Sequence, residues 1–110
     1  MATQHTFSRY TLEALLLLGQ LVREARRERG WTVDELAERV GVSHVTIRKV
    51  ERGDPTVALG TAFEAAGLLR VPLFHEDPAR RRTERARSVD RLAVLPRPAR
   101  LGSAEFDDDF

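Results

Sequence analysis

Residues 31–53, WTVDELAERVGVSHVTIRKVERG, decide the fold of this chain. Thr32 predicts a helix start, because its hydroxyl can accept from a free backbone N–H, and Glu35 at the third helical position completes a capping box. Gly41 predicts the end of that helix, since glycine adopts the left-handed conformation at little steric cost. Ser43 is placed to cap a second helix. The stretch therefore predicts two short helices joined by a tight turn.

Each of the two predicted helices has one apolar face. Leu36, Ala37 and Val40 recur at helical spacing in the first, and Ile47 and Val50 supply the buried face of the second. The remaining side chains of the second helix are left at the surface: His44, Val45, Thr46, Arg48 and Lys49. Two short helices joined by a brief glycine-containing turn form the motif whose second helix enters the major groove of DNA. The stretch therefore indicates DNA binding.

Length and composition exclude several classes of protein. A chain of 110 residues holds one helical core of roughly 60–70 residues plus extensions. Apolar residues recur at helical spacings, which predicts an all-α fold. The chain has no cysteine, so disulfides and cysteine-based zinc sites are impossible. The longest apolar run, residues 14–18, is far below the roughly 20 residues of a membrane span, and no signal peptide is recognisable, so we expect a soluble cytoplasmic protein without a membrane partner.

The sequence offers no candidate catalytic or metal site. Its histidines, His5, His44 and His75, fall in the N-terminal end, the second motif helix and a loop, which is no metal-ligand spacing. A glycine-rich phosphate loop and a Ser/His/Asp cluster are also missing. We therefore expect neither enzymatic activity nor a cofactor.

The net charge of +1 hides an uneven distribution of acids. Four of the 17 acidic residues lie in the last six positions: Glu105, Asp107, Asp108 and Asp109. Without those four, 13 acidic residues remain against 18 basic ones. The rest of the chain is therefore compatible with a polyanionic partner.

Upstream of the motif we expect a flexible N-terminus over residues 1–9 and then one long helix. Thr11 is placed to cap a helix from Leu12 to about Arg29, and Gly30 ends it. The stripe expected to face the core is Leu15, Leu18, Val22 and Ala25. A second apolar set on this helix cannot be buried by the same face: Leu12, Leu16, Leu17 and Leu21. These leucines either pack against the C-terminal helix or form a homodimer or partner surface.

Downstream of the motif we expect two further helices that close the domain. Asp54, Pro55 and Thr56 predict a turn and a helix cap, followed by a fourth helix that Gly67 ends. The next apolar cluster, interrupted by Pro72, predicts a short fifth helix that closes the core and contributes a dimer contact. The residues expected at that dimer surface are Leu69, Val71, Leu73 and Phe74.

The C-terminal third differs in composition from the domain that precedes it. Residues 79–93 are rich in arginine and predict another helix with a sparse apolar side of Val89, Leu92 and Ala93. Pro96, Pro98 and Gly102 then break regular structure. We therefore divide the chain into a flexible N-terminus (1–9), a helix-turn-helix domain (10–75), an Arg-rich helical extension (76–94) and a flexible acidic tail (95–110). Phe106 and Phe110 bracket three aspartates, and this tail either docks on a partner or only adds solubility.

The motif resembles the XRE, or phage-repressor, family of helix-turn-helix proteins. The residues that carry the likeness are 36–39 (LAER), 41–43 (GVS) and 47–53 (IRKVERG). The resemblance implies an all-α fold, a five-helix phage-repressor-like domain with, in this chain, an additional C-terminal helix and a disordered tail. In this family a basic residue on the first helix pairs with an acid at the end of the recognition helix, and Arg26 and Glu51 match that pattern. The resemblance therefore implies a structural role for both.

In such a domain the second motif helix reads bases, and its surroundings hold phosphates. We expect base reading by the five surface residues of that helix, with Val45 on a thymine methyl and Lys49 on guanine O6 or N7. Arg48 either reads a base or grips phosphate. The phosphate contacts we expect are Arg23, Thr32, Ser43, Arg52 and Thr56. One motif reads few base pairs, so we expect a homodimer on a pseudo-palindromic operator in double-stranded DNA.

A narrower resemblance is to HipB-type antitoxins. It rests on the long leading helix, on residues 18–19 (LG) and 22–23 (VR), and on residues 51–61 (ERGDPTVALGT). It implies a repressor that autoregulates a toxin–antitoxin operon and binds a HipA-like serine/threonine kinase toxin. Two alternatives are a stand-alone regulator without a toxin and a protein-interaction module that has lost DNA binding. Against the second alternative, no acid lies between Ser43 and Val50.

Overall fold

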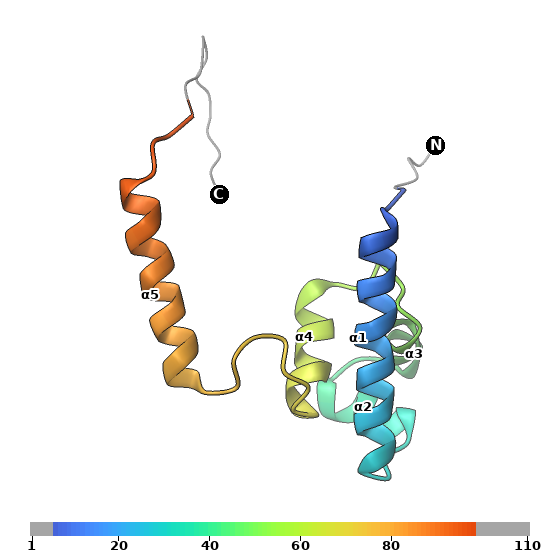
Figure 1. The fold of residues 1–110 in the computed structure, drawn as a ribbon. Helices are drawn as coiled ribbons and strands as arrows, with labels where there is room; N and C mark the ends of the chain where they lie inside the picture. The colour runs from blue at the N-terminus through green and yellow to red at the C-terminus, as the bar shows by residue number, and fades with distance from the viewer. Residues whose placement is uncertain (1–5, 99–110) are drawn as a thin grey trace. The chain divides into compact units, whose positions relative to one another are not determined.

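The computed structural model describes residues 6–98, and all the regular secondary structure in that range is α-helix. The helices are α1 (Arg9–Glu28), α2 (Val33–Val40), α3 (His44–Glu51), α4 (Leu59–Leu68) and α5 (Pro78–Val94), as Figure 1 shows. The chain divides into two compact units, residues 1–76 with α1 to α4 and residues 77–110 with α5. The predicted all-α, helix-turn-helix fold is confirmed. No helix within residues 6–98 combines the length and apolar character that a bilayer crossing requires.

The helix-turn-helix has the capping predicted for it. The Thr32 hydroxyl accepts from the Glu35 N–H at 3.0 Å, and the Glu35 carboxylate accepts from the Thr32 N–H at 2.8 Å. Gly41 ends α2 in the left-handed region at φ 89°. The Ser43 hydroxyl accepts from the Thr46 N–H at 3.3 Å and so caps α3. Local hydrogen bonds therefore fix both ends of the turn.

The start of α1 differs from the prediction. The helix begins at Arg9 rather than Leu12, and its cap is Ser8 rather than Thr11. The Thr11 N–H donates to the Ser8 hydroxyl at 3.3 Å, which places Thr11 inside the first turn. Both residues are good cap formers, and nothing in residues 9–11 breaks a helix, so the earlier cap prevails.

The boundaries of α4 also differ. Thr56 caps no helix, because its N–H and its hydroxyl both donate to the Asp54 carboxylate, at 2.8 and 2.6 Å, and close a turn. The helix begins at Leu59 without a side-chain cap and continues past Gly67. Beyond its end, Arg70 takes the left-handed conformation expected of a glycine, at φ 58°.

The short helix expected within residues 68–74 does not form. Pro72 has no N–H to donate and disfavours a helical residue before it, so the chain leaves α4 as turns and bends up to α5. Leu69 and Val71, placed at the dimer surface by the sequence, belong to the core and are 2% and 9% exposed. That prediction is wrong for these two residues. Leu73 and Phe74 remain exposed, with the Phe74 ring centroid 6.3 Å from that of Phe63.

The core of the first unit lies between α1, α2, α3 and α4. Its buried apolar residues are Val22, Leu36, Ala37, Ile47, Val50, Ala65, Ala66, Leu69 and Val71. Leu18 and Ala25 pack against this core from α1, as the predicted stripe requires. Leu15, the remaining residue of that stripe, is half-buried and is not among the residues packed on the core. Four leucines of α1 are exposed: Leu12, Leu16, Leu17 and Leu21.

The contact between α1 and α3 is close because two glycines lie in it. A Cβ on Gly19 would stand 2.5 Å from the carbonyl oxygens of Val50 and Glu51. A Cβ on Gly53 would stand 2.9 Å from the Leu16 backbone nitrogen, and Gly53 also has φ +75°. The backbones therefore approach to a distance that leaves no space for a methyl group.

The predicted Arg-rich helix forms as α5. The Asp77 carboxylate caps it by accepting from the Ala79 N–H at 3.0 Å, and Pro78 occupies its first turn. None of the residues of α5 is buried.

We expect Gly19→Ala to destabilise the first unit by about 1–3 kcal/mol, because the added methyl group must push α1 and α3 apart. Urea unfolding followed by circular dichroism measures the loss. The matched control is Gly60→Ala in α4, where nothing lies within 4 Å of the added Cβ. The control should be neutral or stabilising by about 0.4–1 kcal/mol. Equal midpoints for the two variants would contradict the close contact.

Candidate nucleic-acid interface

The solvent side of α3 carries the side chains predicted to read bases. His44, Val45 and Arg48 are exposed, while Thr46 and Lys49 are half-buried at the edges of the helix. Ile47 and Val50 occupy the opposite side and are buried. The helix therefore separates its core side chains from a polar, acid-free outer face.

The N-terminal end of α3 has a neighbour that sequence reasoning missed. The Nδ1 atom of His44 lies 3.9 Å from the carboxylate of Asp34, which comes from α2. Both side chains are largely exposed, so the contact is weak and leaves the imidazole open to solvent. The carboxylate places an acidic group beside the first position of the reading face.

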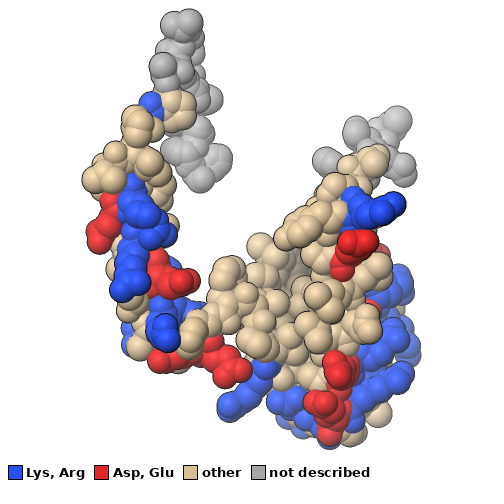
Figure 2. Space-filling view, in the orientation of Figure 1, with Lys and Arg blue, Asp and Glu red and all other residues tan. Residues whose placement is uncertain are grey.

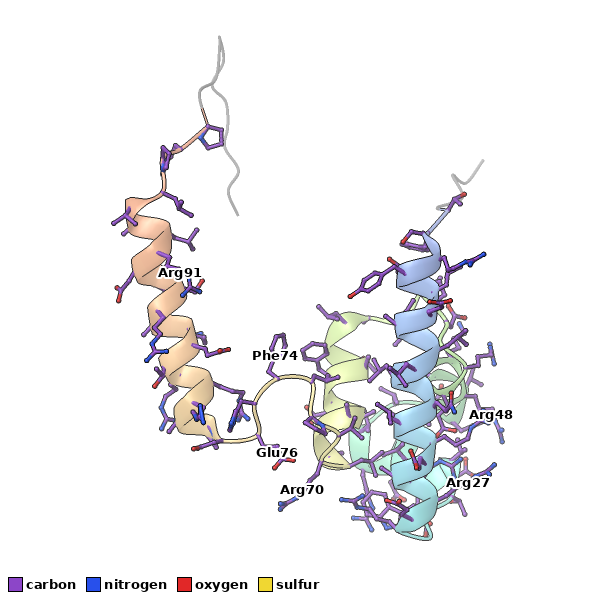
Figure 3. The ribbon with its side chains drawn as sticks, in the orientation of Figure 1. Arg27, Arg48, Arg70, Phe74, Glu76 and Arg91 are labelled. Carbon is purple, nitrogen blue, oxygen red and sulfur yellow. The ribbon has the colours of Figure 1, made fainter. Side chains whose placement is uncertain are left out.

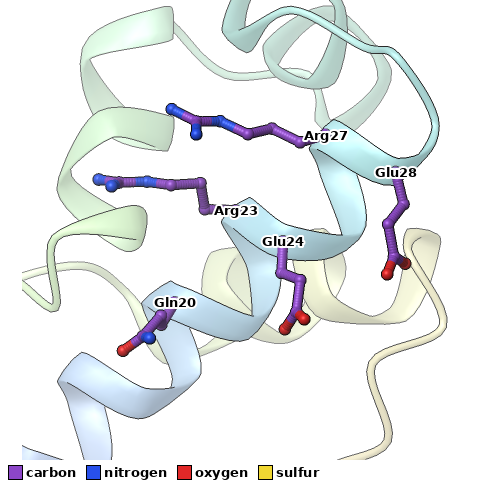
Figure 4. Close-up of a pocket in the computed structure, with 5 residues that line it drawn as sticks. All are labelled: Gln20, Arg23, Glu24, Arg27 and Glu28. Carbon is purple, nitrogen blue, oxygen red and sulfur yellow. The ribbon is translucent and has the colours of Figure 1, made fainter.

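Two arginines of α1 lie beside α3. Figure 4 shows Arg23 and Arg27 extending toward α3, while Glu24 and Glu28 point away from it. Gln20 and these four residues line an open surface hollow. The Nε atom of Arg23 is 3.5 Å from the carboxylate of Glu51, with its side chain still 48% exposed. Sequence reasoning missed Arg27, although its position one helical turn after Arg23 was a usable signal.

We define a basic face that combines these two arginines of α1 with the cations at and just beyond the C-terminal end of α3. Its members are Arg23, Arg27, Arg48, Lys49 and Arg52. Arg27 and Arg48 lie on the same side of the first unit in Figure 3. Figure 2 shows lysine and arginine gathered over that side, with acidic side chains among them. The basic face shares Arg48 and Lys49 with the reading face of α3 and extends beyond it to α1, an arrangement that suits a polyanion with a groove.

The other predicted phosphate contacts are partly occupied by local hydrogen bonds. Thr32 and Ser43 are exposed but serve as helix caps, and Asp34 and Glu35 add negative charge in the first turn of α2. Arg52 is exposed and lies 3.9 Å from the carboxylate of Asp54. The hydrogen bonds from Thr56 hold the pKa of Asp54 below its ordinary value. Because the N–H and the hydroxyl of Thr56 both donate to Asp54, neither is available for a phosphate while this turn is intact.

A buried ion pair holds α3 against α1. The Arg26 Nε donates to the Glu51 carboxylate at 2.6 Å, and a second guanidinium nitrogen donates to its other oxygen at 3.1 Å. A third bond, at 2.8 Å, runs from Arg26 to the Trp31 carbonyl oxygen. The hydrogen bond to Glu51 raises the pKa of Arg26 above its ordinary value, against the opposing effect of burial. The structural role that the family resemblance implies for this pair is confirmed.

The described part of the chain, residues 6–98, holds no cluster of potential metal ligands. The predicted tail-docking residues, Phe106 and Phe110, lie outside the described residues.

Comparison with known proteins places this fold among regulators. The helix-turn-helix family model matches residues 22–75. An uncharacterized HTH-type transcriptional regulator of Methanothermobacter thermautotrophicus is 47% identical over 49 residues, which are 44% of this chain and 71% of that protein. The HTH-type transcriptional regulator SutR of Escherichia coli is 33% identical over 55 residues, 50% of this chain and 31% of SutR. A putative HTH-type regulatory protein of Thermococcus kodakarensis is 41% identical over 46 residues, 42% of this chain and only 14% of that protein.

Solved structures of HipB share the fold over nearly their whole length. HipB in complex with an O4 20-mer has a TM-score of 0.50 and 25% sequence identity, covering 69% of this chain and 99% of that one. HipB in a HipA–HipB–O2–O3 complex gives the same TM-score and identity, with the same coverage. The predicted likeness to HipB is confirmed at the level of structure.

Arg26→Met should cost roughly 3–5 kcal/mol of folding stability, because it leaves the buried Glu51 carboxylate without its main partner. Chemical denaturation of the variant measures this cost. The double change Arg26→Met with Glu51→Leu should recover most of it, since no buried charge remains. Arg27→Met, one residue away and exposed, serves as the control and should change stability by no more than about 0.5 kcal/mol. If Arg26→Met were as stable as Arg27→Met, the ion pair would not be what holds α3 against α1.

Proposed function

This chain belongs to the XRE-type helix-turn-helix family of transcriptional regulators, and from that premise we propose that it is a sequence-specific DNA-binding repressor. The observation that carries the proposal is the acid-free outer face of α3, which the basic face extends onto α1 and which the buried pair of Arg26 and Glu51 holds in place. A docked recognition helix needs these three features together: polar readers, flanking cations and a rigid support.

In the proposed complex α3 lies in the major groove and its outer face meets base edges. Val45, which is 49% exposed, contacts a thymine methyl group. Lys49 donates to guanine O6 or N7, while His44 and Thr46 exchange hydrogen bonds with base edges at the start of the helix. Arg48 reads a base or holds a phosphate. These contacts supply preference for one sequence over another.

The phosphate backbone supplies most of the affinity. Arg52 and Arg23 are the predicted cations, and we add Arg27 to them because it extends along the same side of α1. Thr32 and Ser43 contribute through the N-terminal ends of α2 and α3. Each phosphate that a cation neutralises releases counterions, so binding weakens steeply as salt rises.

We propose a homodimer that binds two half-sites of a pseudo-palindrome. One recognition helix contacts too few base pairs for selectivity, and twofold pairing doubles the site. Exposed apolar residues available for pairing are Leu16, Leu17, Leu73 and Phe74.

We further propose that the repressor is the antitoxin of a HipBA-type operon and neutralises a HipA-like kinase toxin. The likeness to HipB in the HipA–HipB–O2–O3 complex supports this assignment. The alternative is a stand-alone regulator, which is compatible with the likeness to SutR and to the Methanothermobacter protein, both described as HTH-type transcriptional regulators. The two differ only in the partner protein, since both use the same DNA residues.

Lys49→Ala should weaken binding to the preferred operator by about 1–3 kcal/mol and relax preference at one base position. Arg52→Ala should instead weaken binding to all sequences alike, because phosphates carry no sequence information. Mobility shifts on the DNA upstream of this gene, with a panel of single-base changes, separate the two effects. An unchanged base preference in Lys49→Ala would remove that residue from the reading set.

Co-expression with the product of the adjacent gene should yield a stable complex if the antitoxin assignment holds. Deleting residues 101–110 should then lower the affinity of the complex, because the deletion removes Phe106, Phe110 and the acidic residues between them. Isothermal titration of both forms against that gene product measures the difference. Failure to form any complex, with operator binding intact, would select the stand-alone regulator.

A further inference from the structure

Helix α5 has a composition that its fold does not explain. Its residues include six arginines against two acids, Glu84 and Asp90, and none of the seventeen is buried. Arginines on a helix commonly cover apolar surface with their methylene stems or pair with carboxylates.

Three of the arginines share one side of α5. Arg80, Arg87 and Arg91 are spaced at i, i+7 and i+11, which brings them within about 40° of one another around the helix and spreads them over roughly 16 Å along it. Val89 lies on the opposite side, Leu92 lies about 120° around the helix from Arg80, and both are exposed. The side with Arg80, Arg87 and Arg91, which we call the arginine row, is thus a linear array of cations.

The arginine row is not neutralised within its own helix. Glu84 follows Arg80 by four residues and Asp90 follows Arg87 by three, yet within the described helix Pro78–Val94 neither carboxylate lies within ion-pair distance of the row. Three consecutive arginines, at positions 80–82, also stand at the N-terminal end of α5, where the helix dipole disfavours positive charge. The helix dipole therefore does not explain why these charges stand at that end.

We propose that α5 binds the sugar–phosphate backbone of the DNA duplex held by the first unit, with Arg80, Arg87 and Arg91 as the contacts. The proposal rests on the proposed DNA-binding function. A row of unpaired guanidinium groups on an exposed helix complements a regular line of phosphates, and arginine is suited to bind phosphate through two parallel hydrogen bonds. Thr83 and Glu84 lie on or beside the same side of α5, and the three guanidinium groups outnumber the one carboxylate there.

Chain connectivity keeps α5 near any DNA that the first unit binds. The connecting segment, residues 71–76, spans at most about 20 Å when fully extended. A tethered second contact needs little intrinsic affinity, because the tether sets a high effective concentration. Contacts from α5 therefore add affinity and salt dependence without adding sequence preference.

The test compares two matched double variants of the full chain, Arg87→Gln/Arg91→Gln on the arginine row and Arg82→Gln/Arg85→Gln on the opposite side of α5. Glutamine keeps the helix propensity of arginine, and circular dichroism checks that helix content is unchanged. Affinity is measured from low to moderate salt on two duplexes, the DNA upstream of this gene and a scrambled sequence. In the row variant the slope of log K against log salt should become less negative by about 1.8, which is about 0.9 per lost contact, on both duplexes. The opposite-side variant should change it by clearly less.

The outcomes separate this proposal from the proposed function. A slope unchanged in the row variant, with wild-type preference for the upstream duplex intact, overturns the role of α5 and leaves the repressor standing. Equal losses in both variants overturn the assignment to the arginine row. If the row substitutions change the salt slope only in a chain that lacks residues 99–110, the acidic residues at 105–109 bind α5 in the full chain and DNA does not. That result also overturns the proposal. A wild type that binds both duplexes equally, with the slope still reduced in the row variant, supports α5 and overturns sequence-specific repression.

Discussion

The ion pair of Arg26 and Glu51 is the contact on which the geometry of the first unit depends. Two charges out of water are expensive, and their attraction repays the cost only with good geometry and satisfied hydrogen bonds. Here the guanidinium binds both carboxylate oxygens and also the Trp31 carbonyl oxygen. One side chain therefore joins α1, the end of α3 and the turn into α2. Glu51 is the last residue of α3, so the pair fixes the direction of this helix relative to α1.

Tertiary contacts have to fix that direction because α3 is short. A helix of eight residues is marginal in water, and most of its stability comes from packing. Ile47 and Val50 provide the packing, and Gly19 and Gly53 let the α1 backbone approach closely enough for the pair of Arg26 and Glu51 to form. Local caps define where α3 begins and ends, and the contact with α1 defines how it is presented.

Sequence reasoning predicted the features that depend on neighbouring residues. The capping box at Thr32, the left-handed Gly41 and the Arg-rich helix all follow from local hydrogen-bonding and conformational preferences. The choice between Ser8 and Thr11 as a cap could not be predicted, because both satisfy the same rule. Arg70 in the left-handed region was missed because non-glycine residues rarely adopt it. The approach of Asp34 to His44 was missed for a different reason: it joins separate helices, and only the assembled fold shows it.

The division of α3 into a buried side and an open side has an evolutionary consequence. Replacing exposed side chains away from caps and core contacts usually changes stability by less than about 0.5 kcal/mol. His44, Val45 and Arg48 can therefore be exchanged with little risk to folding, whereas Ile47 and Glu51 cannot. If the outer face of α3 reads bases as proposed, a few point mutations there can change the operator that is bound without disturbing the buried residues beneath. Paralogues in one genome could diverge in their targets by this route and still keep a common architecture.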